Sequence, residues 1–212
     1  MKKLDIVYED KYMIIVNKPH NLLTISTDKE KEKTLYHEVL EYERKRNYKI
    51  FIVHRLDKET SGLVLFAKNP KIKESLQNNW ENVKRYYLAL VEGEIKEKGE
   101  VKSYLKETKT LITYSAKQGQ FAHTLYEPIK KINNFTLLNI QILTGRKNQI
   151  RVHMKDINHP IVGDKKYGSK LNPYKHMCLT AYKLELIHPI TKKELVIELP
   201  IPNEYKSNKI EK

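Results

Sequence analysis

The sequence predicts an α+β fold in which a mixed, mainly antiparallel central β-sheet is flanked by helices. Segments rich in β-branched and aromatic residues outnumber the segments with helical periodicity. The strand segments also follow one another without alternating with helices, which favours antiparallel pairing. The 212 residues, 40% of them hydrophobic, suffice for one buried core. We therefore expect a single domain over residues 1–212, with a frayed polar tail at about 203–212.

The first half of the chain is expected to contain two strands and two helices. A β-rich run at 12–18 ends at a proline, and the apolar run 62–68 reads as a buried strand. Thr34 can cap a helix that continues to residue 46, and Asn-Pro at 69–70 opens a second helix. The apolar stripes of these helices are Leu35, Val39 and Tyr42 in the first, and Ile72, Leu76 and Trp80 in the second.

The second half is expected to be mostly strands. The segment 85–93 is apolar on both faces, which is typical of a central strand. One helix is predicted over 146–157, because Ile150, Met154 and Ile157 recur on one face. The remaining predicted strands are 101–106, 121–126, 135–143, 178–187 and 194–199.

The charge balance points to a polyanionic partner. Forty Lys and Arg residues oppose 26 Asp and Glu, which gives a net charge of +14 and a pI near 9.5. Neutralising phosphates releases condensed counterions, so such a chain is suited to bind nucleic acid. A lysine-rich solvated surface would explain the same excess, since the chain has 34 lysines and only six arginines. Charge by itself leaves both readings open.

The remaining composition indicates a soluble cytoplasmic protein that needs no metal. The lone Cys178 cannot form an internal disulfide, which fits a reducing compartment. The N-terminus lacks the apolar region of a signal peptide, and no run approaches the roughly 18 apolar residues that cross a bilayer. His153 and His159 lack zinc-ligand spacing. We expect a monomer without membrane contact.

The rare residues gather in three short segments. Four of the six arginines are Arg55, Arg85, Arg146 and Arg151, and glycines lie in or beside the same stretches. A chain that otherwise uses lysine thus places guanidinium groups here, and only guanidinium offers planar, bidentate pairing with carboxylate or phosphate. Chance clustering is the alternative explanation.

The three segments resemble the motifs of the RluA-type pseudouridine synthases, in the short form without the N-terminal S4 domain. They are HRLDKETSG at 54–62, RYYLALVEG at 85–93 and GRKNQIRVH at 145–153. The order of the three motifs makes the resemblance specific, and it covers nearly the whole chain, from about residue 4 to residue 202. Further matches are NKP at 17–19, HPIVGDKKYG at 159–168 and LTAYKLELIHPIT at 179–191.

The resemblance implies an isomerase that converts specific uridines of structured ribosomal or transfer RNA to pseudouridine. The bond between base and ribose breaks, the base rotates and a carbon–carbon link forms, without any cofactor. A carboxylate beside the sugar must act as nucleophile, or as a base on the sugar. The family motif assigns this catalytic role to Asp57. The substrate uridine must leave its stack to reach it.

The resemblance also assigns the residues that support the reaction. Arg151 is expected to pair with Asp57 and to keep it ionised against desolvation. Tyr87 is expected to stack on the target base, with Ile150 as an apolar wall. Arg55 would fill the vacated stack or hold a phosphate. Tyr86 points away from Tyr87 along the strand and is expected in the core.

The sequence leaves several points open. Lys147-Asn148 stands where many relatives carry Thr-His, and we expect this pair to shape the loop or an RNA contact. The competing interpretation is a non-catalytic RNA-binding or ribosome-assembly protein on the same fold, which charge and tyrosines explain equally well. Neither the target RNA nor the route of glycosidic bond cleavage follows from the sequence.

Overall fold

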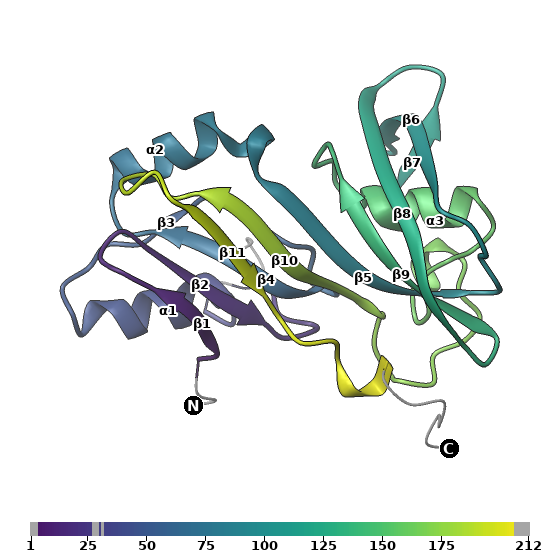
Figure 1. Ribbon diagram of the computed structural model, residues 1–212, viewed down its shortest axis with the longest axis horizontal. Coiled ribbons are helices and arrows are strands. Elements are labelled where there is room, and N and C mark those ends of the chain that lie inside the picture. The colour runs from purple at the N-terminus through teal and green to yellow at the C-terminus, as the bar shows by residue number, and fades with distance from the viewer. Residues whose placement is uncertain (1–3, 27–29, 31, 206–212) are drawn as a thin grey trace. The chain divides into compact units, whose positions relative to one another are not determined.

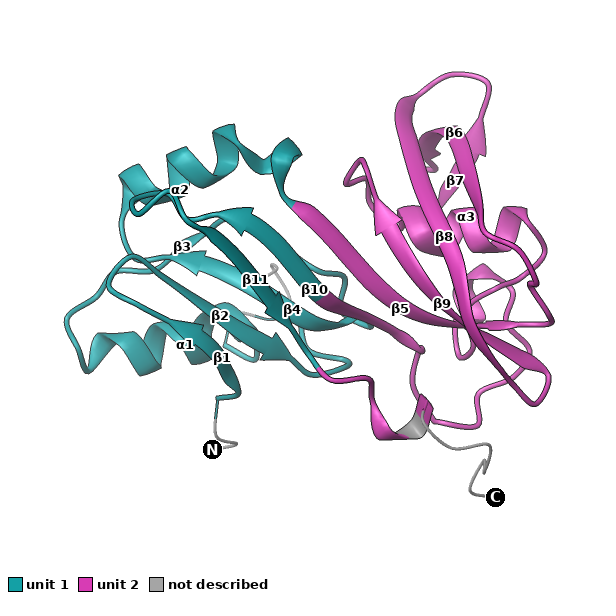
Figure 2. Cartoon of the chain, in the orientation of Figure 1, with its two compact units in different colours: residues 1–83, 183–199 teal, residues 84–182, 200–212 magenta. Residues whose placement is uncertain are grey.

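The computed structural model describes residues 4–26, 30 and 32–205, which form two compact units. Unit 1 comprises residues 1–83 and 183–199, and unit 2 comprises residues 84–182 and 200–212 (Figures 1 and 2). The described residues form three α-helices and a mostly antiparallel set of strands. The predicted α+β class is confirmed.

Unit 1 is a sheet with a helix against each of its two apolar faces. Its strand order is β1-β2-β4-β10-β11, with β3 also pairing with β4. Its elements are β1 (Ile6–Glu9), β2 (Met13–Lys18), α1 (Leu35–Arg44), β3 (Phe51–Ile52), β4 (Ser61–Ala67), α2 (Pro70–Asn78), the 3-10 turn η1 (Trp80–Asn82), β11 (Glu194–Glu198) and the C-terminal part of β10 (Leu179–Ile187).

Strand β4 is buried along its whole length, as its unbroken apolar sequence predicts. Leu63 and Leu65 point into a core cluster that includes Ile72 and Leu76 of α2. The opposite side of the strand carries Phe66, whose ring lies 6.4 Å from that of Tyr36 on α1. Both helices are therefore attached through their apolar stripes.

The helix caps follow the sequence signals, but both helices end earlier than predicted. Thr34 accepts a hydrogen bond from the His37 amide at 3.2 Å, and Asn69 accepts one from the Ile72 amide at 2.9 Å. Helix α1 ends at Arg44, before residue 46. Helix α2 ends at Asn78, so Trp80 lies in the separate turn η1.

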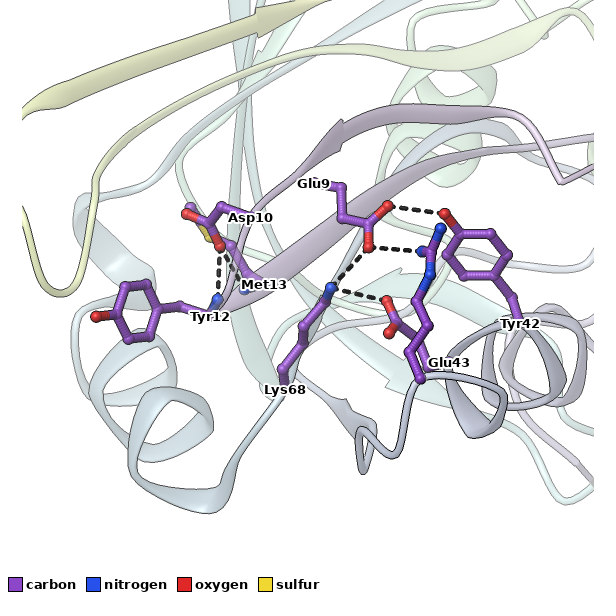
Figure 3. Close-up of polar contacts among 8 residues, drawn as sticks. Glu9, Asp10, Tyr12, Met13, Tyr42, Glu43 and Lys68 are labelled. Carbon is purple, nitrogen blue, oxygen red and sulfur yellow. Dashed lines mark hydrogen bonds and ion pairs between the residues drawn. The ribbon is translucent and has the colours of Figure 1, made fainter.

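The prediction that Tyr42 is a buried residue of α1 is wrong, because Glu43 takes the buried position. The Glu43 carboxylate is inaccessible to solvent and lies 2.9 Å from Lys68 Nζ. Lys68 also contacts Glu9 of β1 (Figure 3), with its Nζ 2.8 Å from the carboxylate. Tyr42 instead donates its hydroxyl to Glu9 at 2.9 Å. Arg46 reaches Glu9 at 3.0 Å.

Unit 2 is a curled antiparallel sheet that carries helix α3 (Gln149–Asp156). Its strand order is β10-β5-β9-β8-β6-β7, and α3 packs against β7 and β8. Its other elements are β5 (Lys84–Glu92), β6 (Gly99–Glu107), β7 (Thr113–Ala116), β8 (Gln120–Ile132), β9 (Phe135–Ile142), η2 (Lys165–Tyr167), η3 (Asn203–Tyr205) and the N-terminal part of β10.

Several differences from the predicted elements occur where the apolar pattern is weak. The strands β1, β3 and β7 have two to four residues and were not predicted. Helix α3 begins at Gln149, three residues later than predicted, and Ile157 is its C-cap. Tyr86, predicted in the core, is half-buried and lines an open groove of about 440 Å³ beside Gln141.

The predicted tail at 203–212 lies partly outside the described residues, which end at residue 205. Residues 203–205 form the short turn η3. Within it, Tyr205 is fully buried and packs edge-on against Tyr174, with ring centroids 6.3 Å apart. Tyr205 thus attaches the start of this segment to unit 2.

Candidate active site

Asp57 lies in the loop that joins β3 to β4 in unit 1, and its side chain is half-buried. The Asp57 carbonyl accepts a hydrogen bond from the Thr60 amide at 3.2 Å, which closes a tight turn. Arg55, two residues earlier, is exposed. His54 accepts a hydrogen bond from the Leu65 amide at 3.0 Å and stacks on Trp80, so it holds the loop in place.

The segment at 18–24 fixes the main chain on both sides of Asp57. The ammonium of Lys18 donates to the carbonyl of Lys58 at 3.0 Å. The hydroxyl of Thr24 donates to the Leu56 carbonyl at 2.7 Å and accepts from the Leu56 amide at 3.1 Å. His20 Nδ1 contacts the Glu59 carbonyl at 3.2 Å. The neighbours of Asp57 in sequence are therefore held by side chains 32 to 40 residues earlier in the chain.

Lys18 is a fully buried lysine whose donors all go to main-chain carbonyls. Besides Lys58, it donates to the carbonyls of Leu22, at 2.7 Å, and Pro19, at 3.1 Å. Burial lowers the pKa of Lys18 to about 8, and the nearby carboxylates of Glu59 and Asp57 oppose that shift. The Lys18 ammonium group therefore lies against the main chain of the loop and interacts electrostatically with the carboxylate of Asp57.

The other predicted site residues belong to unit 2. Tyr87 lies on β5 opposite Ile140 of β9, and its side chain is 9% exposed. Ile150 and Arg151 lie in the first turn of α3 and are each 5% exposed. All three side chains are thus buried within unit 2.

Arg151 is held by a buried carboxylate that sequence reasoning missed. Its Nε and Nη2 atoms donate to Asp164 at 2.7 and 2.8 Å in a bidentate pair, and its Nη1 donates to Asn148 at 3.0 Å. The guanidinium also lies over the Tyr167 ring, 4.8 Å from its centroid. Arg151 is therefore fixed in a single orientation before any substrate arrives.

The loop that carries Asp164 depends on a glycine. Gly163 has φ +82°, and a Cβ there would lie 2.1 Å from the His176 carbonyl oxygen. Only glycine combines this backbone conformation with such a close approach. Residues 159–168 match the family motif in sequence, but the sequence does not reveal that Asp164 binds Arg151.

The departure from the family motif at 147–148 has a local structural role. Asn148 adopts the left-handed conformation, with φ 55°, which asparagine tolerates better than most residues. Its side chain is buried, donates to the Thr113 hydroxyl at 3.3 Å and accepts from Arg151. Lys147 is exposed and pairs with Glu107. Asn148 thus shapes the loop at the start of α3.

Gln149 was not predicted from the sequence as a site residue. Both polar atoms of its side chain form hydrogen bonds that anchor the start of α3. Its Oε1 accepts from the Thr144 hydroxyl at 2.7 Å and from the Arg146 amide at 3.0 Å. Its Nε2 donates to the His123 carbonyl at 3.0 Å and to the Thr124 hydroxyl at 2.9 Å. A buried amide satisfied in this way permits one rotamer, so the helix cannot slide along β8.

His153 makes the second polar anchor between α3 and the sheet. Its ring nitrogens contact the hydroxyls of Ser103, at 3.0 Å, and Thr124, at 2.8 Å. Burial lowers the pKa of His153 to about 4, against the opposing effect of Asp156 and with a small contribution from His123. The imidazole is neutral at physiological pH and connects β6 and β8 to the helix.

No group of three or more His, Cys, Asp or Glu side chains in the described part of the chain could hold a metal ion. No helix among residues 4–26 and 32–205 combines the length and apolar character that a membrane crossing needs.

The fold is that of the pseudouridylate synthases. A human RNA pseudouridylate synthase domain-containing protein superposes with a TM-score of 0.79, over 95% of this chain and 84% of that chain, at 23% sequence identity. Independently of structure, the sequence profile described as RNA pseudouridylate synthase matches residues 12–156. The chain belongs to this family.

Curated relatives carry names from the same family. An uncharacterized RNA pseudouridine synthase of Helicobacter pylori is 43% identical over 143 residues, which are 64% of this chain and 58% of that protein. The ribosomal large subunit pseudouridine synthase C of Rickettsia bellii is 36% identical over 94% of this chain and 69% of its own length. The tRNA pseudouridine synthase C of Haemophilus ducreyi is 32% identical over 96% of this chain and 93% of its own. The match therefore spans less than two thirds of the Helicobacter protein.

Proposed function

We propose that this protein isomerises specific uridines in structured RNA to pseudouridine, with Asp57 as the catalytic nucleophile and no cofactor. The observation that carries the proposal is the clamp on the Asp57 loop, in which Lys18, His20 and Thr24 fix the residues around one half-buried carboxylate. A loop that served only as a connection would not need three buried or half-buried side chains directed at its main chain. Fixing a reactive group in advance lowers the entropy cost of the reaction.

Asp57 acts on the ribose of a nucleotide that has left its stack. Attack of the carboxylate on the sugar breaks the bond to the base and joins Asp57 to the sugar. The base then turns, its carbon 5 bonds to the sugar while the bond to Asp57 breaks, and the proton at carbon 5 is lost. The carboxylate must be ionised for this step. The Lys18 ammonium interacts electrostatically with the Asp57 carboxylate, and a nearby opposite charge favours the ionised form.

The motif positions assign the supporting roles, which we include in the proposal. Arg151 keeps Asp57 ionised, and the bidentate pair with Asp164 gives its guanidinium a fixed plane for that task. Tyr87 stacks on the target base and Ile150 offers an apolar wall. Arg55 is exposed, which suits a phosphate contact or the filling of the vacated stack.

The substrate is ribosomal RNA, transfer RNA or both. One relative named above is a ribosomal large subunit enzyme and another is a tRNA enzyme, each with over 90% of this chain aligned. The net charge of +14 suits either polyanion. We further propose that the protein works in the cytoplasm as a monomer.

Tritium release from RNA labelled at carbon 5 of uridine tests the proposal, because pseudouridine formation replaces that hydrogen. The substrate is total RNA from cells that lack this gene. Wild-type protein should release tritium, and Asp57→Asn should release none above background. Glu59→Gln is the matched control, since it neutralises another half-buried carboxylate of the same loop and should retain activity.

Failure of both wild type and Asp57→Asn to release tritium, with RNA binding intact, would contradict the proposal. That outcome would favour the non-catalytic RNA-binding or ribosome-assembly protein. Mapping pseudouridines in cells with and without the gene would then name the target uridine, because one site should disappear with an active enzyme.

A further inference from the structure

The strands β6, β7 and β8 of unit 2 have one covered face and one open face. Side chains alternate along a strand, so Ser103 and Leu105 of β6 share a face with Ala122 and Thr124 of β8. That face packs against α3, through the hydrogen bond between Ser103 and His153 and through the apolar contact of Leu105 and Ala122 with Val152. Tyr87 of β5 lies on this face too, because it is paired with Ile140 of β9, which is in turn paired with Tyr126 of β8.

The open face carries aromatic side chains where a solvated strand normally carries polar ones. Tyr104 is 46% exposed, Tyr114 41% and Phe121 42%. They are three of the four exposed aromatic residues in the described part of the chain, the fourth being Tyr48. Tyr104 and Phe121 are direct cross-strand partners, with ring centroids 5.8 Å apart and planes at 62°. Three rings on adjacent strands leave much of their π-surface in water.

Positive charges surround these rings. Lys102 and Lys106 flank Tyr104 on the same face of β6 and are both exposed. Arg146 is exposed too, and its Nε donates to the Phe121 carbonyl at 2.9 Å, which holds the guanidinium beside that strand. Residues 99–124 contain four lysines against two glutamates. One of these glutamates, Glu100, binds both Lys102 and the His123 ring.

We propose that this open face, which carries Lys102, Tyr104, Lys106 and Phe121, binds a single-stranded segment of RNA by base stacking, with Arg146 beside the main chain of Phe121. Exposed rings accept the π-faces of successive bases without sequence preference, and neighbouring cations pair with the phosphates. A protein partner fits less well, because the cores of protein–protein interfaces are depleted of lysine. The proposal deepens the proposed function and rests on it, since the segment would belong to the same RNA substrate.

The surface differs from the candidate active-site residues of unit 2 in position and in task. It lies on the opposite side of the unit 2 sheet from Tyr87 and from the buried side chains of α3. It therefore binds nucleotides away from the target uridine and adds affinity without touching the reacting atoms. Loss of this surface should raise KM for a long RNA and leave kcat unchanged.

Two pairs of substitutions distinguish stacking on the aromatic rings from simple apolar contact. Tyr104→Leu with Phe121→Leu removes both rings and keeps apolar side chains. Tyr104→Phe with Phe121→Tyr keeps both rings. The probe is a fluorescently labelled oligouridine, with affinity measured by anisotropy. The leucine pair should weaken binding about tenfold or more, as expected from the loss of one or two stacked bases. The ring-keeping pair should bind within about twofold of wild type, and Tyr48→Leu controls for loss of an exposed ring elsewhere.

Three outcomes distinguish the possibilities, provided that circular dichroism shows both pairs folded. Equal affinity of wild type and the leucine pair overturns the stacking surface, even if tritium release shows an active enzyme. Equal loss in the leucine and ring-keeping pairs also overturns it, because stacking tolerates the exchange of rings. Loss in the leucine pair alone supports it, and does so even if the wild type releases no tritium and the proposed catalysis fails.

Discussion

The ammonium group of Lys18 donates a hydrogen bond of 3.0 Å to the main-chain carbonyl of Lys58, the residue that follows Asp57. Lys18 ends β2, and Gly62, its partner in the sheet, is the second residue of β4, just after the loop. The pairing of β2 with β4 therefore places the buried ammonium group of Lys18 against the main chain of the candidate catalytic loop. Few residues are buried at greater cost than an ionised lysine, which makes this contact the first target for mutation.

Lys18→Met should destabilise the fold and reduce turnover. Methionine fills much of the same volume but leaves the carbonyls of Pro19, Leu22 and Lys58 without a donor, which should cost about 2 kcal/mol or more in unfolding free energy. The loop around Asp57 should also loosen, and kcat should fall more than RNA affinity. Urea denaturation and single-turnover tritium release measure the two effects.

Lys11→Met is the matched control for Lys18→Met, since Lys11 is exposed and lies just before β2, the strand that Lys18 ends. It should change neither the unfolding free energy nor kcat. A Lys18→Met enzyme with normal kcat would show that the loop needs no support from this side chain.

Arg151→Met should reduce turnover far more than it reduces RNA affinity. The guanidinium is only 5% exposed, so it is poorly placed to contact the RNA backbone, and its bonds to Asp164 and Asn148 fix its orientation. If it keeps Asp57 ionised, kcat should fall at least about a hundredfold, as for other preorganised charges. Arg146→Met should show the reverse pattern, because Arg146 is exposed. If Arg151→Met lowers kcat and RNA affinity equally, Arg151 instead contacts a phosphate of the RNA.

The sequence was sufficient to predict the helices and most of the strands, because their apolar periodicity is strong. It failed where an ion pair replaces an apolar residue. Helical spacing places both Tyr42 and Glu43 near the buried stripe of α1, and a carboxylate is the costlier of the two to bury. Only the folded chain brings Lys68 and Glu9 close enough to make Glu43 the buried one.

The same limit applies to the site. Asp57, Tyr87 and Arg151 stand in specific motifs and could be named from the sequence. Asp164 could not, since it lies 13 residues from Arg151 and its role depends on the turn at Gly163. The supports of the Asp57 loop are likewise set by strand pairing, which a single sequence does not reveal.

Lys68→Met should be strongly destabilising, and Glu43→Leu added to it should restore most of the loss. The side chain of Glu43 is inaccessible to solvent and that of Lys68 is 2% exposed, so the single change leaves a buried carboxylate without its cation. A cost of about 3 kcal/mol in unfolding free energy is typical of such a break. A full double-mutant cycle by urea denaturation measures the coupling between the pair.

The exposed pair of Arg44 and Glu41 on the same helix serves as a control for this cycle, since Arg44→Met should change stability little. Additive effects of Lys68→Met and Glu43→Leu would show that the two buried groups do not stabilise each other.

His153→Gln should make stability less dependent on acid pH. Burial lowers the pKa of His153 in the folded state to about 4, whereas an unfolded histidine titrates near pH 6.5. Between these values the unfolded chain binds the extra proton, so the folded state loses stability as pH falls from about 6.5 toward about 4. The contribution is fully present above about pH 6.5. Glutamine cannot titrate, and so it removes this part of the pH dependence.

The measurement is the unfolding free energy of wild type and His153→Gln by urea denaturation at several pH values between about 5 and about 7.5. The wild-type curve should be steeper by about 1 kcal/mol per pH unit in the lower part of that range. The variant will also lose stability at every pH, because a glutamine cannot reproduce both contacts with Ser103 and Thr124. The test therefore lies in the slope: parallel curves would show that His153 titrates normally and that the polar anchor between α3 and the sheet is open to water.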